Sequence, residues 1–225
     1  MTVLFWDIDG TLLTTGKAGV PAWEAAVLET TGRTFALSSI RVPGLTDYQI
    51  AVRTFELLGI PPTDGIVDRM VARYGELLPG TLPLKNGTVL PHVREILECL
   101  RPRQDVRSYL LTGNTREGAR AKLAHYDLLR YFPAGAFAED PGSRASIATR
   151  ALELAQRDGP VNPDRLFVIG DTPHDIECAT AIGARTLAVA TGGYTVEELA
   201  VHVPWRVVDV LPPPHEFVTL LSLPA

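Results

Sequence analysis

Four short stretches of the chain are predominantly apolar and rich in β-branched or aromatic residues. They cover residues 2–6, 106–111, 166–169 and 186–190. The first shows no alternation of polar and apolar positions, which is typical of a strand covered on both faces. Each stretch ends in a loop that is acidic, polar or glycine-rich. The pattern therefore predicts four buried strands that lead into polar loops.

Helical patterns lie between these stretches, with apolar residues three and four positions apart. They cover residues 92–100, 117–125, 146–156 and 175–181. This alternation of strand and helix predicts an α/β fold, a doubly wound parallel sheet with right-handed crossovers. Functional residues of such a sheet gather at the carboxyl ends of its strands.

One interval interrupts the alternation. Three helical patterns, at residues 22–30, 47–58 and 64–77, follow one another without a convincing strand between them. We expect residues 16–85 to form a smaller α-helical cap domain, and residues 1–15 and 86–225 to form the core that contains the sheet. The insertion leaves the core just after the first polar loop, so it is placed to act as a lid over the strand ends.

Composition narrows the classes of partner. A 225-residue chain that is 46% hydrophobic and 21% charged is ordinary for a folded globular protein. The net charge of −5 argues against a nucleic-acid partner. With no signal-like start and no run approaching roughly 18 apolar residues, we expect a cytoplasmic monomer or weak homodimer without a membrane partner. Cys99 and Cys178 lack metal-ligand spacing and are interpreted as packed, reduced thiols.

The first polar loop carries two carboxylates. Asp7 and Asp9 flank a single residue at the end of the first strand, and Gly10 follows where the chain must turn tightly. Carboxylates this close repel each other unless a cation or a shared proton relieves the charge. A hard ion with oxygen ligands, such as Mg²⁺, suits this composition.

Two further loops contribute polar groups. Asp171 and Asp175 follow the third predicted strand, and Thr112, Gly113 and Asn114 follow the second. An aspartate after a strand is often a turn residue or a helix N-cap. Carboxylates in two separate loops, together with a Thr-Gly-Asn loop, nevertheless indicate one shared site at the strand ends.

These motifs resemble those of the haloacid dehalogenase superfamily of hydrolases. The run DIDGT at residues 7–11 resembles its nucleophile motif, Leu111-Thr112-Gly113 its second motif, and Gly170-Asp171 through Asp175 its acidic fourth motif. They occur in the family's order over nearly the whole chain. The resemblance implies a Rossmann-like core with an α-helical cap between the first two motifs, and phosphoglycolate-phosphatase-like chains are the most similar.

The resemblance also implies roles. Asp7 would attack phosphorus and Asp9 would serve as general acid and then general base. The magnesium site would comprise Asp7, Asp9 through its backbone carbonyl, and Asp171, with Asp175 in support. The phosphate-binding groups would be Gly10, Thr112, Gly113, Asn114 and a basic residue.

The identity of that basic residue is open between two candidates. Arg144 precedes the third strand at about the place that the family gives its third motif, and we favour it over Lys122, which lies within the preceding helical pattern. Lys17, near the start of the insertion, could reach a substrate anion or be a solvated hinge residue. Thr46 and Asp47 resemble a cap loop that faces the active site in relatives, although we favour a helix N-cap there.

The predicted function is Mg²⁺-dependent hydrolysis of a small phosphorylated metabolite through an aspartyl-phosphate. A phosphomutase of the β-phosphoglucomutase kind shares the same motifs and is the alternative. A dehalogenase is disfavoured, because Asp9 would serve to protonate an alkoxide leaving group and a halide needs no proton. From another class, a binding protein could keep this fold without turnover.

Overall fold

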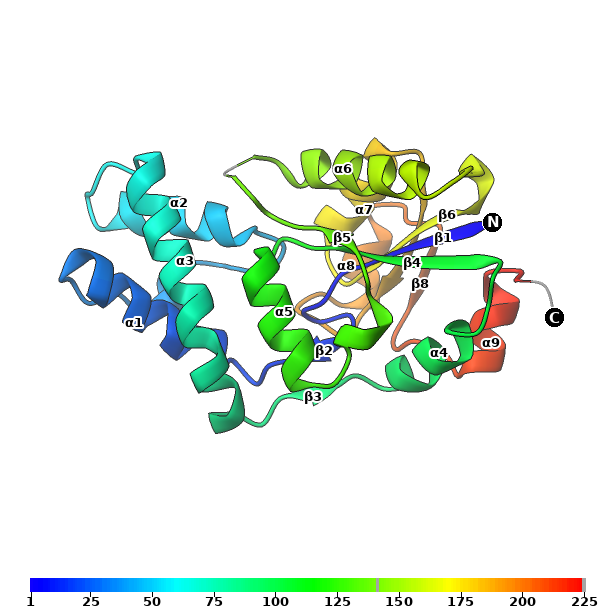
Figure 1. Ribbon diagram of the computed structural model, residues 1–225, viewed down its shortest axis with the longest axis horizontal. Helices are drawn as coiled ribbons and strands as arrows, with labels where there is room; N and C mark the ends of the chain where they lie inside the picture. The colour runs from blue at the N-terminus through cyan, green and yellow to red at the C-terminus, as the bar shows by residue number, and fades with distance from the viewer. Residues whose placement is uncertain (141, 224–225) are drawn as a thin grey trace.

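The computed structural model of the chain describes residues 1–140 and 142–223. Its centre is a six-stranded sheet in the order β5-β4-β1-β6-β7-β8, and all of its neighbouring strands pair in parallel. Figure 1 shows the sheet between two layers of helices. The strands are β1 (Thr2–Trp6), β4 (Val106–Leu111), β5 (Gly135–Ala136), β6 (Leu166–Gly170), β7 (Arg185–Val189) and β8 (Arg206–Val208). The predicted fold class is confirmed.

The four predicted strands form the middle of this sheet. The prediction missed β5 and β8 at its two edges, since elements of two and three residues are too short to show a pattern. It also missed the helices α8 (Val196–Ala200) and α9 (Pro214–Leu220).

Strand β1 is buried on both faces because its side chains alternate between two apolar clusters. Leu4 and Trp6 pack in the cluster under α4 (Val93–Leu100) and α9. Val3 and Phe5 pack in the opposite cluster, under α6 (Arg144–Arg157) and α7 (Pro173–Ala181). The central strand therefore anchors both helical layers, and the loop after it has a fixed position.

A third apolar cluster holds the inserted helices together. The helices are α1 (Gly19–Thr31), α2 (Asp47–Leu57) and α3 (Asp64–Thr81). Their buried side chains include Trp23, Phe55 and Met70. Helix α3 runs four residues beyond the predicted end, through Pro79, and the Thr81 hydroxyl donates to the carbonyls of Leu78 and Ala18 at its end.

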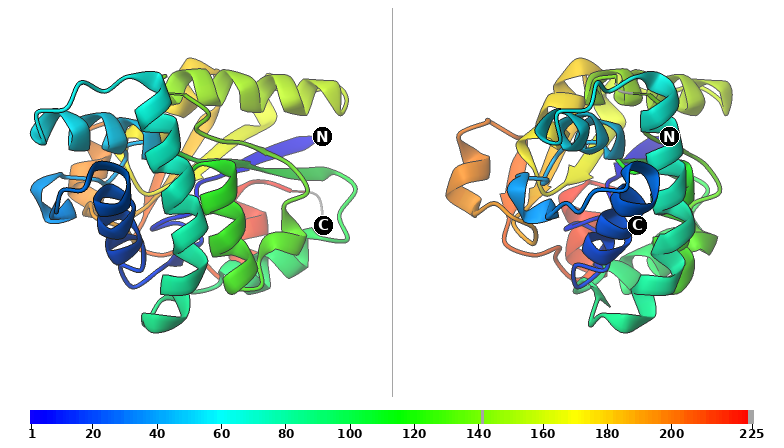
Figure 2. Two further views of the ribbon diagram at one scale, coloured as in Figure 1. Left: turned by 60° about the vertical axis from the view of Figure 1, so that its left-hand side comes forward. Right: turned by 90° about the vertical axis from the view of Figure 1, so that its left-hand side faces the viewer.

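The insertion joins the core at two neighbouring places. Strands β2 (Leu13–Thr14) and β3 (Thr88–Val89) pair antiparallel where the chain leaves and returns. Figure 2 shows α3 alongside α5 (Arg116–His125), the core helix that follows β4. The helical insertion thus contacts the core through α5 as well as through its two connections.

Two local features can be compared with the sequence predictions, the start of α2 and the two cysteines. Thr46 caps α2 in a capping box with Gln49, which confirms the N-cap expectation. Cys99 and Cys178 are free thiols, and Cys178 is fully buried.

None of the helices in the described part of the chain has both the length and the apolar content needed to cross a lipid bilayer.

Removing the Phe217 side chain tests how α9 closes the sheet. Phe217 is fully buried and stacks on Trp6 with ring centroids 5.8 Å apart. Phe217→Ala leaves a cavity against β1, so we expect it to lower the free energy of unfolding by about 3–5 kcal/mol. Urea titration followed by tryptophan fluorescence measures the loss. Val201→Ala, at a side chain that is 75% exposed, is the control and should change the value by less than about 0.5 kcal/mol.

Candidate active site

Asp7 lies at the carboxyl end of the central strand. Its backbone N–H donates to the Ile169 carbonyl at 3.0 Å, which extends the pairing of β1 and β6 by one residue. The side chain is buried. Gly10 turns the following loop with a φ of +83°, and a Cβ atom at Gly10 would overlap the Asp171 carboxylate. Only glycine fits there without displacing a neighbour.

The two acidic loops are neighbours, as the parallel arrangement of β1 and β6 predicts. One carboxylate oxygen from each of Asp7, Asp171 and Asp175 lies within 4.8 Å of the others. All three residues are buried. The Thr11 hydroxyl donates to Asp171 at 3.3 Å.

Electrostatic repulsion makes this cluster a candidate cation site. Burial, and then the Asp175 carboxylate, raise the pKa of Asp7 to about 7, although Arg144 opposes the rise. Burial, Asp175 and Asp7 likewise raise the pKa of Asp171 well above its usual value. A bound cation would relieve the repulsion among these carboxylates. The available donors are carboxylate and carbonyl oxygens, which are the ligands that Mg²⁺ prefers.

Asp175 differs from the other two carboxylates. Its Oδ1 accepts from Arg144 Nη2 at 2.5 Å, and its Oδ2 accepts from the backbone N–H and the hydroxyl of Thr172 at 3.0 and 2.7 Å. Both carboxylate oxygens of Asp175 therefore already accept hydrogen bonds from other groups of the chain. This arrangement suits a residue that supports the site and orients Arg144.

Arg144, the favoured basic candidate, lies beside Asp7. Helix α6 begins at Arg144, and the guanidinium Nη2 is 3.6 Å from Asp7 Oδ1. Nη1 donates to the Gly44 carbonyl of the insertion at 3.4 Å, whereas Nε is buried without a partner in the described residues. Burial lowers the pKa of Arg144, but Asp175 and Asp7 together raise it further. The group stays cationic next to Asp7.

The loop after β4 brings polar groups to the same place. The Thr112 hydroxyl lies close enough to Asp7 to oppose, as a small contribution, the rise in the pKa of that carboxyl. It also accepts from the backbone N–H and the side-chain amide of Asn114, at 3.3 and 2.8 Å. A Cβ atom at Gly113 would lie 3.0 Å from Arg144 Nη1 and from the Leu45 carbonyl. Glycine thus lets this loop approach both Arg144 and the insertion.

Lys122, the other basic candidate, contacts Asp9 and not Asp7. Its Nζ lies 2.5 Å from Asp9 Oδ2 and donates to Asn114 Oδ1 at 2.5 Å. The Asn114 amide donates to the same Asp9 oxygen at 2.8 Å. Burial lowers the pKa of Lys122, and the charges of Asp9, Tyr74 and Asp47 raise it by more. Lys122 is therefore a buried cation beside the more exposed carboxylate.

Asp47 links the insertion to the loop after β4. Its backbone N–H donates to the Gly113 carbonyl at 2.8 Å, and its carboxylate accepts from the Thr115 N–H at 2.7 Å. Burial raises the pKa of Asp47 to about 6, although Lys122 opposes the rise. From the sequence we favoured a helix N-cap at Thr46 and Asp47 over a loop that faces the active site. The sequence did not predict these two contacts of Asp47, because they join groups that lie far apart in the chain.

The remaining candidate lies apart from these groups. Lys17 is exposed, with a φ of +66°, at the connection into the insertion. No hydrogen bond or ion pair within residues 1–140 and 142–223 joins it to the carboxylate cluster. Its predicted contact with a substrate anion stays a prediction.

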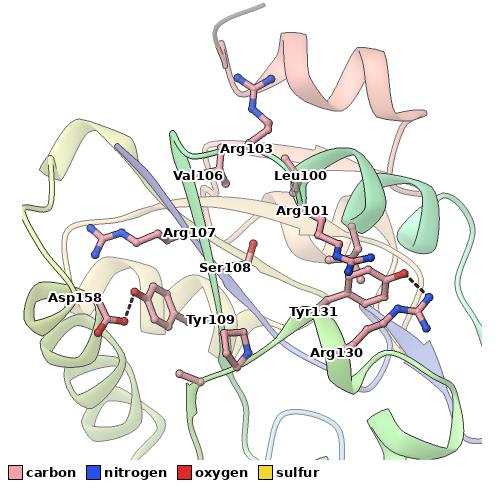
Figure 3. A pocket seen from close by; sticks show the side chains of 13 residues that line it. Leu100, Arg101, Arg103, Val106, Arg107, Ser108, Tyr109, Arg130, Tyr131 and Asp158 are labelled. Atoms are coloured by element: carbon pink, nitrogen blue, oxygen red, sulfur yellow. Dashed lines mark hydrogen bonds between the residues drawn. The ribbon is translucent and has the colours of Figure 1, made fainter.

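A separate pocket opens near the amino end of β4, away from the carboxylates. Its volume is about 390 Å³. Figure 3 shows Tyr109, Tyr131 and arginine side chains around it. The Tyr109 hydroxyl donates to Asp158, and Arg107 donates to the backbone carbonyls of Ala155 and Pro160. These side chains are engaged in packing α6 and η3 (Leu129–Tyr131) beside the sheet edge.

Comparison with solved structures supports the fold. CbbY of Rhodobacter sphaeroides, solved in complex with phosphate, superposes with a TM-score of 0.72 at 17% identity, covering 93% of this chain and 95% of that one. A predicted phosphoglycolate phosphatase of Haemophilus somnus superposes with a TM-score of 0.70 at 17% identity, covering 99% and 97%. At these identities the likeness establishes the fold.

The sequence comparison covers less of the chain. The tyrosine-protein kinase PtkA of Mycobacterium tuberculosis is 36% identical over 88 residues, which are 39% of this chain and 30% of the kinase. The model of the haloacid dehalogenase-like hydrolases matches residues 4–180, from the first strand to the helix after Asp171. The resemblance seen in the motifs is thereby confirmed, and the chain belongs to the haloacid dehalogenase-like hydrolase family.

Proposed function

We propose that the protein is a Mg²⁺-dependent phosphatase that hydrolyses a small phosphorylated metabolite through an aspartyl-phosphate on Asp7. The observation that carries the proposal is the convergence of a buried carboxylate cluster with the Arg144 guanidinium and the Thr112 hydroxyl. Oxygen ligands for a cation and hydrogen-bond donors for phosphoryl oxygens thus lie around one nucleophile.

The donor set fits a magnesium ion. The carboxylates of Asp7 and Asp171 and the backbone carbonyl of Asp9 would hold it, and Asp175 would orient the site through Arg144 and Thr172. When bound, the ion offsets the negative charge that otherwise keeps a carboxylate from approaching a phosphate.

The positions of the side chains support the following steps. An Asp7 oxygen attacks phosphorus, the bond from phosphorus to the leaving oxygen breaks, and Asp9 gives its proton to that oxygen. Asp9 then takes a proton from water, whose oxygen attacks phosphorus. The bond to Asp7 breaks and inorganic phosphate leaves. Arg144 and Thr112, with the N–H groups of the loop after β4, would bind the phosphoryl oxygens throughout.

The position of the helical insertion is an argument for a small substrate. Residues 16–85 would form the cap, which reaches the phosphate loop through Asp47 and contacts Arg144 through the Gly44 carbonyl. A cap docked this closely would admit only a compact metabolite and would exclude water during the first step. Which metabolite fits depends on cap side chains.

Hydrolysis of p-nitrophenyl phosphate tests the proposal. We expect activity with Mg²⁺, loss of activity with EDTA, and recovery when Mg²⁺ is restored. Asp7→Asn should lower kcat by at least about 10⁴-fold, because it removes the nucleophile. Circular dichroism of the variant is the control for folding.

No Mg²⁺-dependent release of phosphate from this substrate or from a broad panel of phosphorylated metabolites would contradict the phosphatase. Turnover only with a sugar bisphosphate present, without accumulation of free phosphate, would favour the mutase. The mutase is the alternative because it shares these motifs and transfers the same phosphoryl group.

The position of Asp171 can be tested through its neighbour. A Cβ atom at Gly192 would overlap the Asp171 carboxylate, whereas one at Gly193 would meet only the Pro43 side chain at 3.5 Å. Gly192→Ala should therefore displace Asp171 and raise the Kd for Mg²⁺ by about tenfold or more. Isothermal titration of the metal-free protein measures the change. Gly193→Ala is the matched control, and equal Kd values for the two variants would count against Asp171 as a ligand.

A further inference from the structure

We propose that Lys122 is a positioning residue for Asp9, which it holds toward the reacting oxygen together with Asn114. This inference rests on the proposed function, in which Asp9 carries the proton. It assigns different roles to the two basic candidates. Arg144 lies beside the nucleophile Asp7, and Lys122 positions the acid–base group Asp9.

Asp9 needs such support. Its side chain is 41% exposed, in contrast to the buried side chains of Asp7 and Asp171. In the described part of the chain, the hydrogen bonds to its carboxylate come from Lys122 and Asn114, and both go to Oδ2. This leaves Oδ1 outside the network. Without these donors the side chain could rotate into solvent.

Lys122 and Asn114 form a closed triangle with Asp9. Lys122 donates to the Asn114 carbonyl oxygen, so the Asn114 amide group must point its NH₂ at Asp9 and at Thr112. Lys122 therefore fixes the orientation of an amide that also touches the Thr112 hydroxyl. The position of Asp9 is tied in this way to the phosphate-binding loop.

Stability alone does not account for Lys122. The side chain is 7% exposed, and it lies on α5 on the same buried face as Ala119 and Leu123. Burying an ammonium group costs free energy, and apolar side chains of similar volume often replace buried ion pairs without loss of stability. An apolar residue in place of Lys122 alone would fill this place on the helix face, but it would leave the Asp9 carboxylate, and the buried Asp47 carboxylate whose pKa Lys122 lowers, without their cation.

The two basic groups do not overlap in their contacts. Arg144 bonds to Asp175 and lies beside Asp7, and Lys122 bonds to Asp9 and Asn114. Loss of Lys122 should leave the Arg144 contacts intact. Its effect should therefore depend on how much the reaction needs a proton from Asp9.

Two aryl phosphates of nearly the same shape can test whether Lys122 acts through the proton of Asp9. Phenyl phosphate releases a more basic oxygen than p-nitrophenyl phosphate and so needs the proton more. The value of kcat/KM reports the steps up to departure of the leaving group. For Lys122→Met we expect kcat/KM to fall about 10- to 100-fold with phenyl phosphate and about threefold or less with p-nitrophenyl phosphate. Lys122→Gln, which keeps a polar head, is a second variant.

A double-mutant cycle gives an independent readout. If Lys122 acts through Asp9, Lys122→Met should cost little in an Asp9→Asn background. Lys85→Met removes an exposed lysine at the return connection and is the matched control. Equal losses with both substrates, no loss, or additive losses in the cycle would overturn the positioning role. Those results would leave the proposed function standing, since that depends on the Mg²⁺-dependent activity of the unaltered protein and on Asp7.

Discussion

Repulsion among buried carboxylates is the constraint on which the rest of the site depends. Parallel pairing of β1 with β6 brings the loops of Asp7 and Asp171 together, and burial removes the water that would screen them. Arg144, which Asp175 holds in place, balances part of this negative charge. A bound cation would balance the rest. Parallel pairing of β1 and β6 thus creates a repulsion among carboxylates that a bound cation would relieve.

The helical insertion is part of this balance. Asp47 contacts the loop after β4 with both its N–H group and its carboxylate, and Gly44 accepts a hydrogen bond from Arg144. The insertion therefore contacts Arg144 and the loop after β4, both of which would take part in binding the phosphoryl group in the proposed mechanism. Docking of the insertion and ordering of the phosphate loop are linked through these few hydrogen bonds.

Much of this could be predicted from the sequence, because long apolar strands and local motifs carry their own signals. The central strands, the insertion and the acidic loops belong to that class. The edge strands β5 and β8 are too short to show a period. The sequence also left Arg144 and Lys122 as competitors, since it cannot show which carboxylate each one faces. A signal for Lys122 was present, because it is a lysine on the apolar face of a helix with Ala119 and Leu123.

The two connections to the insertion run side by side. Strands β2 and β3 pair there, and Gly16 packs so closely on the backbone of Asn86 and Gly87 that a Cβ atom would overlap it. Because the outgoing and returning segments are joined, neither can lengthen or swing without the other. Movement of the insertion away from the core would therefore carry both connections together, and it would also have to break the contact of α3 with α5 and the hydrogen bonds of Asp47 and Gly44.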